Sequence, residues 1–228
     1  MNLIKTLAAL LFFATQSAKA QTYNIDYTYP RTKHSIIRQD KKLGMIDSNN
    51  RIIIPPLYDK LIDFNDGLAR VEQNDKVGFV DEQGKLVIPC MYEPDTLYIT
   101  GNQTWHVMHA DGGESIQIGA TPERIGFTEG LACVIQNGKY GFINKENKTV
   151  IPFQYDGADN FLDSIAIVKQ NDKYGAIDRT GKIIIPLIYD LLVWESPNSW
   201  QPLLFSKKDG ECFLMDKDQK HIRGCYDK

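Results

Sequence analysis

One 20-residue phrase recurs along this chain and constrains its fold more than any other feature. The phrase reads NGKYGFINKENKTVIPFQYD at 137–156 and NDKYGAIDRTGKIIIPLIYD at 171–190. Other copies are DKKLGMIDSNNRIIIPPLYD at 40–59 and NDKVGFVDEQGKLVIPCMYE at 74–93, and a worn copy stands at 212–227. Repetition at a fixed period is typical of architectures in which each unit buries its apolar face only by stacking on its neighbours.

The spacing of one glycine in each copy sets the register. Gly44, Gly78, Gly141 and Gly175 are separated by 34, 63 and 34 positions, and the Pro and Tyr of each copy keep these spacings. We interpret the gap of 63 as two units, of which one, at about 94–125, is shortened and lacks the Ile-Pro and Tyr-Asp signatures. Such a unit is expected either to bend the array or to open a cleft.

Each unit predicts three short β-strands. In the unit that contains the copy at 74–93, the strands cover 67–73, 77–81 and 85–88. All three are short and rich in β-branched or aromatic residues. The Pro that follows the third strand is expected to end it, because Pro cannot donate a hydrogen bond to a sheet ladder.

The turns between these strands have their own residue preferences. The first turn holds Asn137-Gly138 in one copy and Asn-Asp in others, and such pairs are preferred in two-residue type I′ hairpins. The second turn holds Gly or Asn at one position, so we expect a left-handed backbone there. The residues at that position are Asn50, Gly84, Asn147 and Gly181.

These elements resemble the WG-repeat (KWG-type) proteins, whose units run Lys-Trp-Gly-aromatic-Ile-Asp, Gly-Lys, Ile-Pro and Tyr-Asp. The chain keeps Lys-x-Gly, the hairpin, Ile-Pro and Tyr-Asp in at least four units, over roughly 35–228. It departs from the family at the Trp, which is replaced by Leu43, Val77, Tyr140 and Tyr174. The resemblance implies an all-β repeat array and no particular reaction.

We therefore expect one all-β repeat domain at 35–228, preceded by an extended lead-in at 21–34. It would contain about six three-stranded antiparallel units of about 34 residues each. An open, curved stack is the leading geometry. The alternative is a closed propeller, whose blades normally have four strands.

The first 20 residues predict a cleaved signal peptide. Lys5 precedes an apolar run at 7–14, and Ala18-Lys19-Ala20 fits the small-x-small cleavage rule. The run is shorter than the roughly 20 apolar residues that span a membrane, so no stable membrane span is expected after cleavage. We expect export to the periplasm or outside a bacterial cell. Loss of Lys5 and Lys19 leaves 24 basic and 29 acidic residues, a charge of −5 that argues against nucleic-acid binding.

Acidic side chains recur after the Tyr of each unit, at Asp59, Glu93, Asp156, Asp190 and Asp227. Because they recur, we expect them to cap backbone N–H groups of turns rather than to catalyse a reaction. The residues of one non-repeated stretch have metal-ligand chemistry but poor spacing, so no metal or other cofactor is expected. They are His106, His109, Asp111 and Glu114.

Trp105, Trp194 and Trp200 are the only tryptophans, and all three lie where the repeat is broken. They either fill gaps in the core or form exposed aromatic contacts for a protein or a glycan. We take them as the candidate binding residues.

The four cysteines invite pairing in an exported chain. Cys212 and Cys225 lie on the two arms of the last hairpin, nearly symmetric about its turn, so we predict a disulfide between them. Cys90 and Cys133 could pair or remain buried as small apolar residues.

The leading functional hypothesis is a non-enzymatic exported module that binds a protein or a cell-envelope polymer, because repeat stacks present extended surfaces. The alternative is a hydrolase acting on envelope polymers, with its acids in the cleft of the shortened unit. An enzyme should bring unique polar residues to one place, whereas most polar residues here recur. The sequence therefore favours binding.

Overall fold

The computed structural model describes residues 23–94, 96–100, 104–108, 114–118, 126–194, 204–216 and 221–224. The predicted signal peptide lies outside these ranges. The described residues form strands and turns, and they contain no helix long and apolar enough to cross a membrane. The expected all-β repeat array is thus confirmed.

The described strands form six antiparallel sheets, which we number in chain order. Sheet 1 contains β1 (Asn24–Thr28), β2 (Ser35–Gln39), β3 (Lys42–Ile46) and β4 (Ile52–Tyr58). Sheet 2 contains β5 (Lys60–Asn65), β6 (Leu68–Gln73), β7 (Lys76–Asp81) and β8 (Leu86–Tyr92). Sheet 3 contains β9 (Thr96–Thr100), β10 (Thr104–Met108) and β11 (Glu114–Ile118).

The other three sheets repeat the four-stranded pattern of sheets 1 and 2. Sheet 4 contains β12 (Phe127–Thr128), β13 (Leu131–Gln136), β14 (Lys139–Asn144) and β15 (Thr149–Tyr155). Sheet 5 contains β16 (Gly157–Ala158), β17 (Ile165–Gln170), β18 (Lys173–Asp178) and β19 (Ile183–Tyr189). Sheet 6 contains β20 (Leu191–Trp194), β21 (Leu204–Lys208), β22 (Glu211–Met215) and β23 (His221–Gly224).

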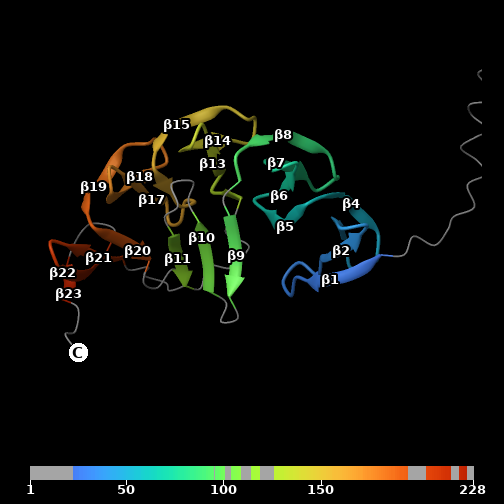
Figure 1. Cartoon of the computed structure of the whole chain (residues 1–228), viewed down its shortest axis with the longest axis horizontal. Coiled ribbons are helices and arrows are strands. Elements are labelled where there is room, and N and C mark those ends of the chain that lie inside the picture. Colours follow the sequence, from blue (N-terminus) through green and yellow to red (C-terminus); the bar gives the residue numbers. More distant parts are fainter. Residues whose placement is uncertain are drawn as a thin grey trace, which may run out of the picture.

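The four-stranded sheets follow one another along an open arc, from sheet 1 in blue to sheet 6 in red (Figure 1). In sheets 2, 4 and 5 the last strand lies on the convex side of the arc. Sheet 3 is drawn on the concave side in this view. The open, curved arrangement is the leading geometry expected from the sequence.

The units of the arc have four strands, one more than the three predicted. The additional strand is the first of each sheet, and in sheets 4 and 5 it is only Phe127–Thr128 and Gly157–Ala158. A two-residue strand is too short to show an alternating pattern of apolar residues. In sheet 1 this strand is Asn24–Thr28, so the lead-in is part of the first sheet.

The repeated Pro lies inside the last strand of each unit and does not end it. Pro89, for example, is an exposed residue within β8. Because β8 is at the edge of its sheet, the missing N–H removes no ladder hydrogen bond. A bulge accompanies the Pro, since the register shifts between the pairs Phe79↔Ile88 and Val77↔Tyr92.

This bulge explains the repeated glycine. A Cβ atom on Gly78 would lie 2.6 Å from the carbonyl oxygen of Ile88, and one on Gly175 would lie 2.6 Å from that of Ile185. The last strand therefore crosses so close to the glycine that no side chain fits.

The apolar core lies between consecutive sheets rather than within one sheet. Sheets 1 and 2 bury a shared cluster that includes Met45, Tyr58 and Val71. Sheets 4 and 5 share a cluster around Tyr140 and Phe142, and sheets 5 and 6 share another. Stacking is thus what buries each unit's apolar face, as expected for a repeat array.

Sheet 2 packs directly on sheet 4, in contrast to the expected row in which a shortened unit separates them. The rings of Phe79 and Phe127 lie 4.9 Å apart, within one cluster shared by the two sheets. The N–H of Glu93 donates to the carbonyl of Ile135 at 3.0 Å, and Asp156 makes the equivalent bond from sheet 4 to sheet 5. Sheet 3 is therefore not in line between its neighbours. The gap of 63 positions is one repeat step of 34 with 29 residues inserted.

Candidate functional site

The carboxylate after each Tyr joins one sheet to the next. Asp156 accepts a hydrogen bond from the N–H of Asn171 at 2.8 Å and forms an ion pair with Lys139. The expectation that these carboxylates cap turns is confirmed, with the addition that the turn belongs to the following sheet. The same pair of partners occurs for Asp59 (Lys42 and Asn74) and for Asp190 (Lys173 and Asp209).

These contacts also set the charge of the carboxylates. The hydrogen bond from Lys139 holds the pKa of Asp156 below its ordinary value, and Lys42 does the same for the pKa of Asp59. Such groups stay ionised at neutral pH and act as structural anions. Asp227 lies outside the described residues.

Glu93 replaces the Asp at the junction between sheets 2 and 4. Its two carboxylate oxygens accept from the N–H groups of Asn137 and Gly138, at 2.8 and 3.0 Å. The repeated capping contact thus passes from sheet 2 to sheet 4 without involving sheet 3.

A second row of acids joins the sheets at the opposite ends of the strands. Asp66 accepts from the N–H of Gly130 at 2.7 Å and from Lys145 Nζ at 2.9 Å. Glu129 accepts from the N–H of Ser164 at 3.1 and 3.2 Å. These acids were not predicted, although Asp66 and Glu129 are separated by 63 positions, the spacing of the repeated glycines on either side of the insertion.

These turns of sheets 2, 4 and 5 surround an open groove with a volume of 670 Å³. Glycine and polar or charged residues form its whole lining. Arg179 reaches toward the turn of sheet 4, since its Nη2 atom lies 3.6 Å from where a Cβ on Gly130 would be.

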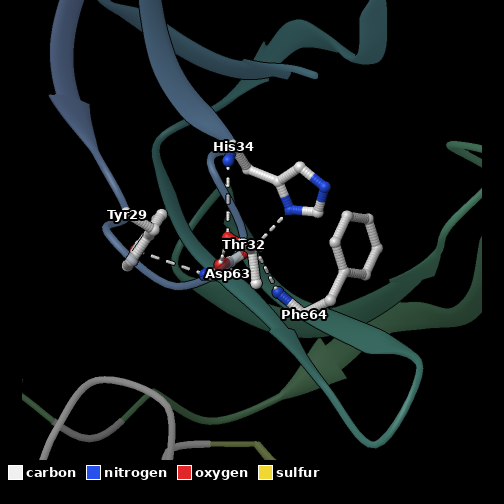
Figure 2. A network of polar contacts seen from close by, with 5 residues as sticks. All are labelled: Tyr29, Thr32, His34, Asp63 and Phe64. Atoms are coloured by element: carbon white, nitrogen blue, oxygen red, sulfur yellow. Dashed lines mark hydrogen bonds and ion pairs between the residues drawn. The ribbon is translucent and has the colours of Figure 1, made fainter. Parts of the chain in front are cut away.

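A buried polar network ties the lead-in to sheet 2 (Figure 2). Asp63, with 1% of its surface exposed, accepts from the Thr32 hydroxyl, from His34 Nδ1 at 2.8 Å and from the N–H of Phe64 at 2.8 Å. Its own N–H donates to the Tyr29 hydroxyl at 3.2 Å. None of these residues lies in the recurring 20-residue phrase, so the phrase did not predict the network.

The predicted site residues lie in different parts of the molecule. Trp105 is in β10, paired with Ile99 and Gln117. Trp194 is partly buried against the core cluster of sheets 5 and 6, and its Nε1 has no hydrogen-bond partner in the described part of the chain. Trp200 lies outside the described residues.

The four residues with metal-ligand chemistry lie partly within and partly outside the described ranges. His106 is in β10 and Glu114 is in β11, while His109 and Asp111 lie outside the described ranges. Where the chain is described, no group of three or more His, Cys, Asp or Glu is placed to hold a metal ion.

Cys90 and Cys133 form no disulfide, and both are partly buried. Burial raises the pKa of the Cys90 thiol, which keeps it protonated at neutral pH. Cys212 is disulfide-bonded. Its predicted partner, Cys225, lies outside the described residues, and that pairing stays a prediction.

A family model described as "WG containing repeat" matches residues 44–76, 78–93, 123–140, 140–174 and 174–192. This chain belongs to the WG-repeat family. The Trp position of the WG-repeat motif lies in the core between sheets, where Val77 and Tyr140 are buried. At these two positions an aliphatic or an aromatic side chain thus takes the place of the Trp in the core.

No curated protein matches the sequence. Among solved structures, a eukaryotic initiation factor is similar at 10% identity and a TM-score of 0.41, over 92% of this chain and 66% of that one. PorZ, a surface component of the type-IX secretion system of Porphyromonas gingivalis, is similar at 10% identity and 0.33, over 87% and 26%. A protein of unknown function from Bacteroides caccae is similar at 10% identity and 0.30, over 84% and 72%. Function does not transfer at these values.

Proposed function

We propose that this WG-repeat protein is an exported, non-enzymatic interaction module that holds a protein or a cell-envelope polymer. The repeated polar groups are already engaged, since Asp156 and its counterparts bond the next sheet. Partner contacts are therefore sought among residues that the repeat does not require.

One observation carries the proposal: residues between Glu93 and Gly126 are inserted into an array that is continuous without them. The contacts from Glu93 to Ile135, Asn137 and Gly138 are those of an ordinary junction between units. An insertion that the scaffold does not need is where binding groups concentrate on repeat proteins.

The tryptophans in the non-repeated segments are the proposed contacts. Trp105 is on the central strand of sheet 3, and Trp200 is in the segment between β20 and β21. Trp194 packs on the core, so its replacement is expected to affect stability as well as binding.

The test is capture of partners from envelope extracts by the mature chain and by Trp105→Ala and Trp200→Ala. We expect both variants to retain less partner than the parent. Tyr27→Ala is the matched control, because Tyr27 is an exposed aromatic residue of β1, outside the insertion. Equal capture by all four proteins, or a large drop in melting temperature for both Trp variants, would contradict the proposal.

One arrangement favours the alternative of an envelope hydrolase. His34 is hydrogen-bonded through Nδ1 to the buried carboxylate of Asp63, as in dyads that activate a nucleophile. Hydrolysis of a cell-wall preparation by the parent chain, absent in His34→Ala, would support this second function. Unchanged hydrolysis in that variant, or none in the parent, would exclude the dyad.

A further inference from the structure

The groove between the turns of sheets 2, 4 and 5 has walls that are fixed before any ligand arrives. Asp66 contacts two turns of sheet 4, through Gly130 and Lys145, and Glu129 contacts a turn of sheet 5 through Ser164. A binding surface that is already ordered loses little conformational entropy when a ligand binds.

Several polar groups on these walls are not used by the fold. Among the described residues, Arg179 and Glu146 form no hydrogen bond or ion pair through their side chains, and both are exposed. Asn144 uses its side-chain oxygen to cap the N–H of Lys148, which leaves its amide N–H groups free. The groove thus offers a guanidinium, a carboxylate and an amide together.

Arg179 stands at a position that the repeat leaves variable. The equivalent residues of the other turns are Ser48, Glu82 and Lys145. The fold therefore does not require an Arg there, in contrast to the Gly or Asn two residues later, where the backbone has positive φ. Binding of a ligand would explain why this position carries an Arg.

The chemistry of the groove favours one class of ligand. The lining holds charged groups of both signs, since Asp66, Glu129 and Glu146 are acids and Lys145 and Arg179 are bases. No aliphatic or aromatic side chain lines it, which disfavours an acyl chain or an apolar peptide anchor. Sugar hydroxyls both donate and accept hydrogen bonds, and they match a surface that presents both kinds of group at close spacing.

We infer that this groove binds an uncharged, hydroxyl-rich glycan, with Arg179, Glu146 and Asn144 as the contacting residues. The inference deepens the proposed interaction function and rests on it. It places the glycan on the turns of sheets 2, 4 and 5, on residues other than the tryptophans proposed as partner contacts.

The experiment is affinity electrophoresis of the mature chain in gels that contain dextran, laminarin, xylan or galactomannan, with polygalacturonate and chitosan oligomers as charged counterparts. We expect at least one neutral glycan to retard the parent. Arg179→Ala and Glu146→Ala should each weaken that affinity by about tenfold, because each removes a charged hydrogen-bonding group.

Glu82→Ala is the matched control, because it changes the same turn position in sheet 2 and does not line the groove. Its affinity should equal that of the parent. Retardation by charged glycans alone, or equal retardation of the parent and both groove variants, would overturn the inference. So would the absence of any glycan binding, and if the chain still captures a protein through its tryptophans, the interaction function survives that result.

Discussion

Single residues of this chain owe their identity either to backbone conformation or to close packing. Asn50, Gly84, Asn147 and Gly181 have φ of 59°, 78°, 60° and 85°, so the left-handed position expected in the second turn is confirmed. The repeated glycines of the strands have a different reason, since the bulged last strand leaves no room for a Cβ.

Gly175→Ala is predicted to lower the free energy of unfolding by about 2–3 kcal/mol, because its Cβ would meet the backbone of Ile185. Chemical denaturation of the mature chain measures it. Gly67→Ala is the comparison. Gly67 has a φ of 82° but open space around it, so only the strain of a left-handed backbone lowers the free energy of unfolding, by about 1 kcal/mol. Equal losses in the two variants would show that close packing is not the reason for the strand glycine.

Asp63→Ala is predicted to lower the free energy of unfolding by about 2–4 kcal/mol, because it leaves partly buried donors of Thr32, His34 and Phe64 without their acceptor. Asp47→Ala removes an exposed carboxylate that caps two N–H groups of its own turn, and it should cost less. If the two denaturation midpoints fall equally, the network of Figure 2 does not hold the lead-in to sheet 2.

At the scale of the strand and the sheet, the junctions between units carry both the apolar clusters and the carboxylate contacts. Each outer strand leaves one edge unpaired, and aliphatic residues such as Ile52, Leu86 and Ile183 are exposed on it. The Pro and the bulge in each of these strands disfavour pairing with another chain at that edge. The edge is thus protected by the same residues that form the repeat signature.

The junction carboxylates predict an acid-sensitive fold. Because the folded-state pKa values of Asp59, Asp156 and Asp190 are lowered, their stabilisation is complete above the ordinary carboxyl pKa of about 4 and is lost as pH falls through the folded values. The urea midpoint of the parent should be level from pH 7 to about 5 and then fall.

Asp156→Asn should begin from a lower midpoint at pH 7 and fall less steeply in acid. Lys139→Met should have the same effect, since Lys139 is the main cause of the lowered pKa. The double variant should add little to either single change. If the urea midpoints of the variants fall with pH below about 5 as steeply as that of the parent, these ion pairs do not contribute to stability.

The sequence predicted the parts of the fold that depend on local backbone chemistry. Turn conformations, the second and third strands of each unit and the capping acids all follow from residue types at fixed spacing. The first strand of the unit was not predicted, because a strand as short as Gly157–Ala158 shows no alternating pattern. The prediction that Pro89 ends its strand was wrong, because the sequence does not show that this strand lies at the edge of its sheet. The groove was not predicted, because it forms only where turns of three units meet.

At the scale of the whole molecule, the array is a row of five four-stranded sheets with sheet 3 inserted between the second and the fourth (Figure 1). Asp63, Gly126 and Asn160 stand at equivalent positions, 15 residues before the repeated glycine of their units. The junction acids Asp59 and Asp156 precede Asp63 and Asn160 by four positions, whereas Glu93 precedes Gly126 by 33. Three residues would therefore connect Glu93 to Gly126 in an ordinary junction. Length alone predicts two units in line. The contacts of Glu93 and the cluster that sheets 2 and 4 share distinguish an insertion from a unit of the row.

The most direct measurement is thermal unfolding of a mature chain in which residues 94–125 are replaced by the three residues Gly-Ala-Asp, copied from 157–159. If sheets 2 and 4 are true neighbours, this shortened chain keeps its β-sheet circular dichroism and melts in one transition within about 4 °C of the parent, a change of about 1 kcal/mol. A chain that fails to fold, or that melts far below the parent, would contradict the account, because residues 94–125 would then be part of the row.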